Sequence, residues 1–186
     1  NVKFAHVTRA GNSRPQLVIV DGDLAIPCSL LNQPHETLQQ LIDAGPAALT
    51  HLQDAARTTP SSEWTPLSEC EFHSAVLQPP IVLAVGLNYD EHASELSLDN
   101  DSGPVLFSLF PNSLNGHGQD VPLVPPHMSE EIDYEGELGV IIGKAATNVT
   151  PEEALDYVFG YTAVNDITAR NIQFAEPQWS RCKSFN

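Results

Sequence analysis

Basic residues are scarce in this chain. Eight Lys and Arg oppose 24 Asp and Glu among 186 residues, which gives a formal net charge of -16. Such a charge repels phosphate backbones and anionic lipid, so we expect neither nucleic acid nor membranes as partners. The most general consequence of the charge is solubility. Because Lys3, Lys144 and Lys183 are the only lysines, a lysine in a binding site would be a distinctive feature.

Cysteines and long apolar runs are scarce as well. No pair among Cys28, Cys70 and Cys182 has the spacing of metal ligands, and three unpaired cysteines favour a reducing compartment. The longest apolar run, residues 81–87, is too short to cross a bilayer, and the N-terminus shows no signal-peptide pattern. We therefore expect a cytoplasmic protein.

The length suits one good core, or one domain with a small appendage. We expect a small N-terminal domain at residues 1–70 and a second domain at residues 71–186. In the first, residues 16–20 and 24–26 favour short strands around the turn Asp21-Gly22-Asp23. Residues 37–44 favour a helix that Gly45-Pro46 ends, and residues 47–52 a second helical stretch. This region carries no recognisable chemistry.

The second domain is rich in short β-type runs. Residues 81–85, 105–110, 135–142 and 161–165 favour strands. Thr150-Pro151-Glu152-Glu153 is typical of a helix start, and that helix should run to about Phe159. Many short strands with few helices indicate a β-dominated α+β fold.

Acidic residues alternate along one of these strands. Asp133, Glu135 and Glu137 should share a face, where neighbouring carboxylates repel unless they are solvated, protonated or bridged by a cation. Carboxylate oxygens are the ligands that Mg²⁺ and Mn²⁺ prefer. Asp166 ends the next strand, where functional groups are often presented. Spacing alone leaves open a solvated strand edge for the glutamates and a helix N-cap role for Asp166. Gly136 between the glutamates hints at a close approach by another group.

Two further positions can carry chemistry. His92 and Glu95 lie on one side of any helix there, so the carboxylate could support the imidazole as a base. Lys183 could hold a substrate carboxylate or stabilise a developing enolate. A surface His–Glu pair and a solvated surface lysine are the alternatives.

From about residue 80 to its end, the sequence resembles the fumarylacetoacetate hydrolase family. The stretches that carry the resemblance are Val85-Gly86-Leu87-Asn88-Tyr89 with His92 and Glu95, Asp133-Tyr134-Glu135-Gly136-Glu137-Leu138, Asn165-Asp166-Ile167-Thr168-Ala169-Arg170, and Gln173, Trp179 and Lys183-Ser184-Phe185. The resemblance implies a mixed β-sandwich roll with a small N-terminal β-rich domain, assembled as a homodimer. It also implies that the C-terminal part of the roll is absent from this chain.

The resemblance assigns a role to each residue of the site. It makes Glu135, Glu137 and Asp166 ligands of Mg²⁺ or Mn²⁺; His92, Glu95 and Lys183 catalytic; and Asn88, Tyr89, Arg170 and Gln173 substrate contacts. The implied reaction cleaves a C–C bond next to a carbonyl in a small keto or diketo acid. Hydrolysis of acylpyruvates and decarboxylation of oxaloacetate-like acids are the two forms, and isomerisation or tautomerisation of related dienoic acids is an alternative.

The sequence departs from the family pattern at three points. Leu109 stands where many members have lysine, and Asn186 stands where aspartate usually follows the Lys-Ser-Phe segment. The chain also ends before the strands and the Gly- and Thr-containing loop that normally follow. These departures leave open a non-catalytic fragment or descendant, and a purely structural cation site.

Overall fold

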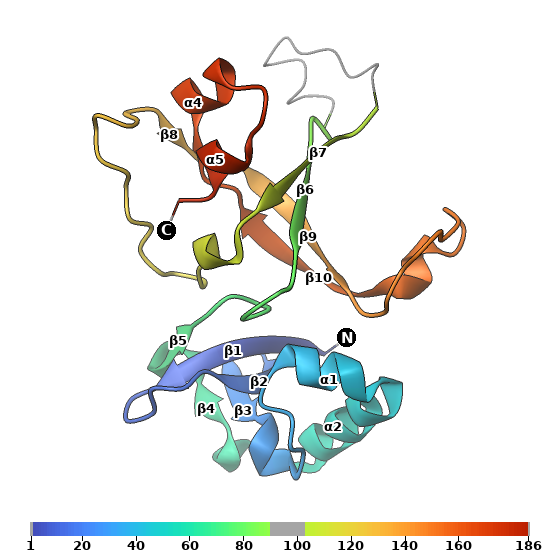
Figure 1. Cartoon of the computed structure of the whole chain (residues 1–186). Helices are drawn as coiled ribbons and strands as arrows, with labels where there is room; N and C mark the ends of the chain where they lie inside the picture. Colours follow the sequence, from blue (N-terminus) through green and yellow to red (C-terminus); the bar gives the residue numbers. More distant parts are fainter. Residues whose placement is uncertain (1, 90–102, 186) are drawn as a thin grey trace. The chain divides into compact units, whose positions relative to one another are not determined.

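The computed structural model describes residues 2–89 and 103–185, which form two compact units (Figure 1). The N-terminal unit comprises Asn1–Leu77, Asn115–Asp120 and Leu138–Ala163, and the C-terminal unit comprises Gln78–Leu114, Val121–Glu137 and Val164–Asn186. His92 and Glu95, the predicted general base and its supporting carboxylate, lie outside the described residues. Asn186, which departs from the family pattern, also lies outside them. The domain boundary near residue 70 stays a prediction.

The N-terminal unit is built on an antiparallel five-stranded sheet with the order β4-β3-β2-β1-β5. Its strands are β1 (Lys3–Arg9), β2 (Gln16–Asp21), β3 (Leu24–Pro27), β4 (Thr65–Pro66) and β5 (Cys70–Phe72). Asp21 pairs with Leu24, and Gly22 between them adopts a φ of 56°, a value that favours glycine. The predicted hairpin is confirmed.

Two helices lie between β3 and β4 in the chain, α1 (Leu38–Ala44) and α2 (Pro46–Thr58). Thr37 caps α1: its side chain accepts from the Gln40 N–H, and the Gln40 side chain accepts from the Thr37 N–H. Gly45, with a φ of 82°, ends α1, and Pro46 begins α2. Both predicted helices are confirmed, and the second is longer than residues 47–52.

The helices cover one face of this sheet (Figure 1). The buried side chains that join them to the sheet are Leu17, Ile19 and Ile26 from the strands, and Leu38, Leu41 and Leu52 from the helices. The other sheet face carries a smaller cluster around Val7, Val18 and Ala25. Burial of these apolar groups is the main stabilising contribution in this unit.

His6 connects β1 to the start of α1 inside this core. The ring is 1% exposed, its Nε2 accepts from the Leu38 N–H at 3.1 Å, and its Nδ1 lies 3.3 Å from the Ser74 carbonyl oxygen. One acceptor and one donor nitrogen are the pattern of a neutral imidazole. Burial is the main cause that lowers the pKa of His6, although the backbone contacts at Ser74 and Ala75 act in the opposite direction.

We expect the protein to lose stability as the pH falls below about 6.5, the ordinary pKa of histidine. Because the pKa of His6 is lowered by folding, the unfolded chain binds the proton more readily, and the stabilisation is complete only above that pH. Urea unfolding at about pH 5 and about pH 7.5 measures the effect. His6→Gln should reduce the pH dependence, and His51→Gln, at an exposed position, should not. Equal pH dependence in wild type and His6→Gln would contradict this explanation.

Among its described residues, the C-terminal unit contains two short antiparallel strand pairs. β6 (Val82–Gly86) pairs with β7 (Val105–Leu109), and β8 (Ile132–Asp133) pairs with β11 (Thr168–Ala169). Two short helices, α4 (Arg170–Ala175) and α5 (Ser180–Lys183), follow β11. A further pair, β9 (Gly136–Ile142) and β10 (Val158–Asn165), has residues in both units. The predicted β-dominated α+β fold is confirmed.

The helix predicted from Thr150 to Phe159 is wrong. The segment forms a turn and one short 3₁₀ helix, Ala154–Tyr157, and β10 begins at Val158. The Thr150 hydroxyl donates to the Glu153 carboxylate instead of capping a helix N–H. Phe159 packs against the main core of the N-terminal unit, and its ring centroid lies 6.3 Å from that of Phe4. Tertiary packing therefore extends the strand at the expense of the local helix signal.

Gly86, at the end of β6, lies against the indole of Trp179. A Cβ at this position would lie 2.4 Å from the Trp179 Cζ3 atom, and the same ring packs edge-on against Phe107 at a centroid distance of 5.6 Å. We expect Gly86→Ala to lower the free energy of unfolding by about 1–3 kcal/mol, because the added methyl group overpacks this contact. Thermal and urea unfolding measure the change. Gly136→Ala is the matched control, since an added Cβ there meets no described atom within 4 Å. Equal stability of the two variants would contradict this prediction.

The sequence predicted that another group would approach Gly136 closely. No such approach is seen among the described residues. Separately, no helix in residues 2–89 and 103–185 is both long and apolar enough to cross a membrane.

Candidate active site

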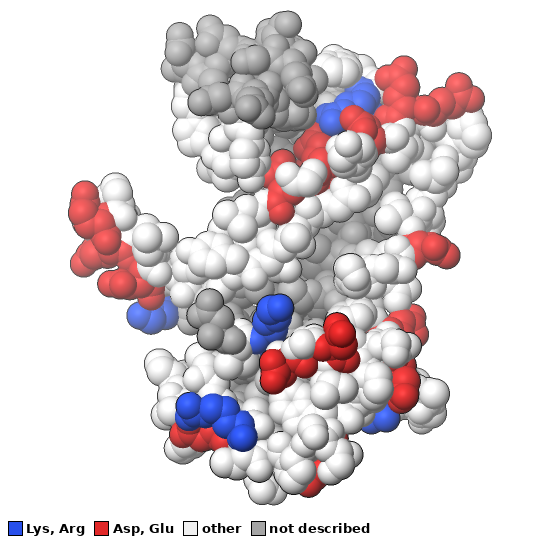
Figure 2. Space-filling view, turned by 180° about the vertical axis from the view of Figure 1, so that it is seen from behind, with Lys and Arg blue, Asp and Glu red and all other residues white. Residues whose placement is uncertain are grey.

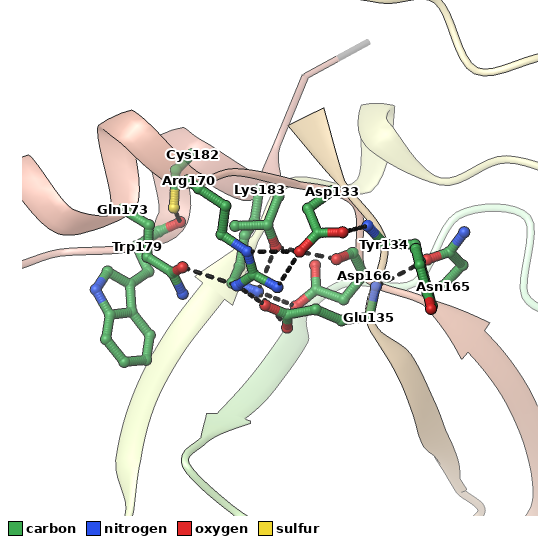
Figure 3. Close-up of polar contacts among 11 residues, drawn as sticks. Asp133, Tyr134, Glu135, Asn165, Asp166, Arg170, Gln173, Trp179, Cys182 and Lys183 are labelled. Carbon is green, nitrogen blue, oxygen red and sulfur yellow. Dashed lines mark hydrogen bonds and ion pairs between the residues drawn. The ribbon is translucent and has the colours of Figure 1, made fainter. Parts of the chain in front are cut away.

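Two chain segments lie side by side at the centre of the candidate site (Figure 3). Glu135 lies between β8 and β9, and Asp166 lies between β10 and β11. The Asp166 N–H donates to the Glu135 carbonyl oxygen at 2.8 Å, and the Glu135 N–H donates to the Asn165 Oδ1 at 3.1 Å. These contacts place two carboxylates, 31 positions apart in sequence, in one site.

Lys183, the last residue of α5, points into this site (Figure 3). Its side chain is 2% exposed, and its Nζ donates to Glu135 Oε2 at 2.7 Å, Asp166 Oδ2 at 2.8 Å and Thr168 Oγ1 at 2.7 Å. An ammonium group has three protons, so each has an acceptor. Lys183 is therefore not a solvated surface lysine.

Thr168 and Asp166 are held together by a second contact. The Thr168 side chain is fully buried, and its hydroxyl donates to the Asp166 carbonyl oxygen at 3.0 Å while it accepts from Lys183. The N-cap of α4 is Ala169, so the helix-cap alternative for Asp166 is wrong. Our prediction missed Thr168, although its spacing indicates it: Thr168 lies two residues after Asp166, and on an extended segment residues two apart lie on one side.

The Arg170 side chain forms hydrogen bonds and ion pairs with neighbouring side chains of the site (Figure 3). Its Nε and Nη2 donate to Asp133 Oδ2 at 3.0 and 2.9 Å, and its Nη1 donates to Gln173 Oε1 at 2.9 Å and pairs with Glu135 Oε1. Burial acts to lower the pKa of Arg170, but its contacts with Asp133 and Glu135 outweigh burial and raise it. The side chain is 15% exposed and fixes the orientation of Glu135. Substrate contact by Arg170 or Gln173 stays a prediction.

The three carboxylates predicted as metal ligands differ in electrostatic environment. Burial would raise the pKa of Glu135, but Lys183 and Arg170 more than offset it, and the net shift is downward. For Asp166, burial raises the pKa despite the opposing effect of Lys183. The pKa of Glu137 is raised by burial and then by the negative charges of Glu135 and Asp166. Negative charge in the site is therefore only partly compensated by the protein.

A count of the formal charges also indicates that the negative charge of the site is only partly compensated. The described residues of the site comprise four carboxylates (Asp133, Glu135, Glu137 and Asp166) and two cations (Arg170 and Lys183), which leaves two negative charges when all six are ionised. Among residues 2–89 and 103–185, no three Cys, His, Asp or Glu side chains converge as a ready-made ligand set. The donors are nonetheless all carboxylate oxygens with a deficit of two positive charges, and that donor set fits Mg²⁺ or Mn²⁺.

The remaining predicted site residues have varied outcomes. Tyr89 forms a side-chain hydrogen bond to the Glu137 carboxylate, which connects it to the site. Asn88 is exposed, and no substrate contact of either residue is tested. Leu109, at the end of β7, pairs with Val82.

Figure 2 shows that acidic side chains are spread over one face of the molecule while basic ones are few. Two basic groups inside one acidic site are therefore a local exception.

Several known proteins are similar to this chain in sequence. The chain is 40% identical over 123 residues to the oxaloacetate tautomerase YisK of Bacillus subtilis, a match that covers 64% of this chain and 40% of that protein. It is 46% identical over 107 residues to the caffeoylpyruvate hydrolase of Neonothopanus nambi, covering 56% of this chain and 37% of that protein. The chain thus spans less than half the length of these curated relatives.

The fold comparison agrees with the sequence comparison. The structure of a fumarylacetoacetate hydrolase from Exiguobacterium antarcticum matches all of this chain and 63% of that chain, with a TM-score of 0.77 and 27% identity. The predicted fold is therefore confirmed, and the chain is shorter than this solved relative. Residues 81–186, more than half of the chain, match the family described as fumarylacetoacetate (FAA) hydrolase, C-terminal. The chain belongs to the fumarylacetoacetate hydrolase family.

Proposed function

We propose that this protein is a divalent-metal-dependent enzyme that cleaves a C–C bond next to a carbonyl in a small keto or diketo acid. The observation that carries the proposal is a group of four carboxylates and two cations among the described residues, in which Glu135, Asp166 and Lys183 are largely buried and the carboxylates outnumber the cations by two. Such a deficit attracts a divalent cation, and the cation in turn makes a strongly acidic protein able to receive an anionic substrate.

Glu135, Glu137 and Asp166 would hold Mg²⁺ or Mn²⁺. The bound ion would supply Lewis acidity toward the carboxylate and keto oxygens of the substrate. Lys183, at hydrogen-bonding distance from Glu135 and Asp166, would supply a positive charge beside the developing enolate. Arg170 would keep Glu135 oriented. We propose His92 and Glu95 as the general-base pair that activates water in a hydrolase.

The relatives support the substrate class. One is an oxaloacetate tautomerase and another a caffeoylpyruvate hydrolase, and both names denote small keto acids as substrates. Acylpyruvate hydrolysis and oxaloacetate decarboxylation are therefore the first reactions to test. The tautomerase relative also favours a second candidate, tautomerisation or isomerisation at the same site, which requires the enolate-stabilising groups but no water.

Product analysis distinguishes these reactions. We would incubate the protein with acylpyruvates and with oxaloacetate, each with Mg²⁺, Mn²⁺ or EDTA, and follow products by NMR. Hydrolysis yields two acids, decarboxylation releases CO₂, and tautomerisation only speeds the interconversion of the enol and keto forms. The proposal expects turnover with metal and none with EDTA. No turnover of any of these acids by folded, metal-loaded protein would contradict it and favour the non-catalytic alternative.

Assembly and location complete the proposal. We propose a homodimer in the cytoplasm, on the family resemblance and on the three free cysteines. Light scattering coupled to size-exclusion chromatography measures the subunit number.

A further inference from the structure

Both oxygens of Glu135 are engaged by cations of the protein itself. Oε1 pairs with Arg170 and Oε2 accepts from Lys183 at 2.7 Å, and the Glu135 side chain is only 9% exposed. Lys183 also donates a hydrogen bond to one oxygen of Asp166. A divalent ion that binds Glu135 and Asp166 therefore lies close to at least one of these cations, and the repulsion between like charges opposes its binding.

The two cations differ in how firmly they are held. Arg170 donates through Nε and Nη2 to Asp133 and through Nη1 to Gln173, so its planar group is fixed by contacts outside the proposed ligand set. Two of the three acceptors of Lys183 are proposed metal ligands, and the third is the neutral hydroxyl of Thr168. A bound metal would therefore disturb more contacts of Lys183 than of Arg170. The flexible lysine side chain could lose its contacts with the two carboxylates and keep its hydrogen bond to Thr168.

We propose that Lys183 is the internal counter-ion of the metal-free site, and that a divalent cation binds by displacing its ammonium group from Glu135 and Asp166. This inference rests on the proposed function, because it presupposes a divalent-ion site at these carboxylates. Lys183 neutralises two buried acids when no ion is present, and Thr168 retains the ammonium group when the ion takes their oxygens. The lysine thereby lowers metal affinity while it preserves the folded site.

Neutral substitutions of Lys183 test this directly. Without the ammonium group, the site lacks three positive charges instead of two, so attraction for a divalent ion increases. We expect Lys183→Gln and Lys183→Met to bind Mn²⁺ about tenfold or more tightly than wild type at about pH 8. Metal-free variants should melt about 5–10 °C lower, because the buried carboxylates of Glu135 and Asp166 lose one of their partners. Mn²⁺ should then raise their melting temperature more than it raises that of wild type.

Two controls separate this effect from general charge removal. Arg181→Gln removes a cation two residues away whose exposed side chain pairs with Glu176, and its Mn²⁺ affinity should equal that of wild type. Lys183→Arg keeps the charge and should not bind more tightly. Free Mn²⁺, followed by electron paramagnetic resonance, gives the affinity, and circular dichroism establishes folding. Lys183→Gln retains a hydrogen-bond donor, so it carries the test if Lys183→Met does not fold.

The outcomes separate the inference from the proposed function. If wild type binds Mn²⁺ and Lys183→Gln binds it equally or more weakly, the inference is overturned while metal dependence stands. If neither wild type nor any variant binds Mn²⁺, both the proposed metal dependence and the inference are overturned. Tighter binding in Lys183→Gln, with wild-type affinity in Arg181→Gln, supports the inference.

Discussion

Replacing Glu135 with glutamine is expected to remove measurable Mn²⁺ binding and to lower turnover of the keto-acid substrate by about a hundredfold or more. Glu135 is the proposed ligand that contacts both cations of the site, so it couples metal binding to the positions of Arg170 and Lys183. The amide keeps the size of the side chain but loses the negative charge that attracts the ion. Mn²⁺ titration and steady-state kinetics on the same preparations measure both effects.

The matched control for this prediction is Glu130→Gln, which removes the same charge at an exposed position. Its Mn²⁺ affinity and turnover should remain within about twofold of wild type. Wild-type turnover in Glu135→Gln would mean that the carboxylate group has no part in catalysis. Lost Mn²⁺ binding with unchanged turnover would favour the alternative of a purely structural cation site.

Arg170→Met is expected to produce the largest loss of stability, about 3 kcal/mol in the free energy of unfolding. The substitution removes one partner of Asp133 and Glu135, and of the two cations described at the mostly buried Glu135 carboxylate it leaves Lys183. A buried charge that loses one of its compensating partners is costly because the protein interior solvates it poorly. Urea unfolding of the metal-free protein measures the loss, and metal-free conditions keep the result independent of ion binding.

Exposed arginines provide the comparison for this prediction. Arg57 pairs with Asp54 and Arg181 pairs with Glu176, but the arginine side chains are 76% and 60% exposed. Exposed pairs contribute little, so Arg57→Met and Arg181→Met should each change stability by less than about 1 kcal/mol. If Arg170→Met is no more destabilising than these variants, the proposed role of Arg170 in fixing Glu135 is wrong.

Local sequence signals predicted the parts of the fold that local interactions determine. The turn at Gly22 and the helix of residues 37–44 depend on neighbours within a few residues, and both predictions are confirmed. The prediction of a helix after Thr150 was wrong because Phe159 packs against a core that is distant in sequence, and its segment is part of β10. Such competition between a local preference and tertiary packing is invisible in one sequence.

The candidate site shows the same division. Alternation along the chain identified Asp133, Glu135 and Glu137 as a possible group, and the strand end identified Asp166. The positions of the cations could not be derived in this way. Arg170 reaches Asp133 because β11 pairs with β8, and Lys183 reaches Glu135 across 48 positions of sequence. The neutral hydroxyl that completes the lysine site, Thr168, was missed because it is neither charged nor a preferred metal ligand.

A crystal structure of the protein soaked in Mn²⁺, with anomalous diffraction recorded near the manganese edge, tests the central claim most directly. The account predicts one strong anomalous peak coordinated by Glu135, Glu137 and Asp166, with Lys183 withdrawn toward Thr168. No peak at these three carboxylates, or a peak only elsewhere on the acidic surface, would contradict it.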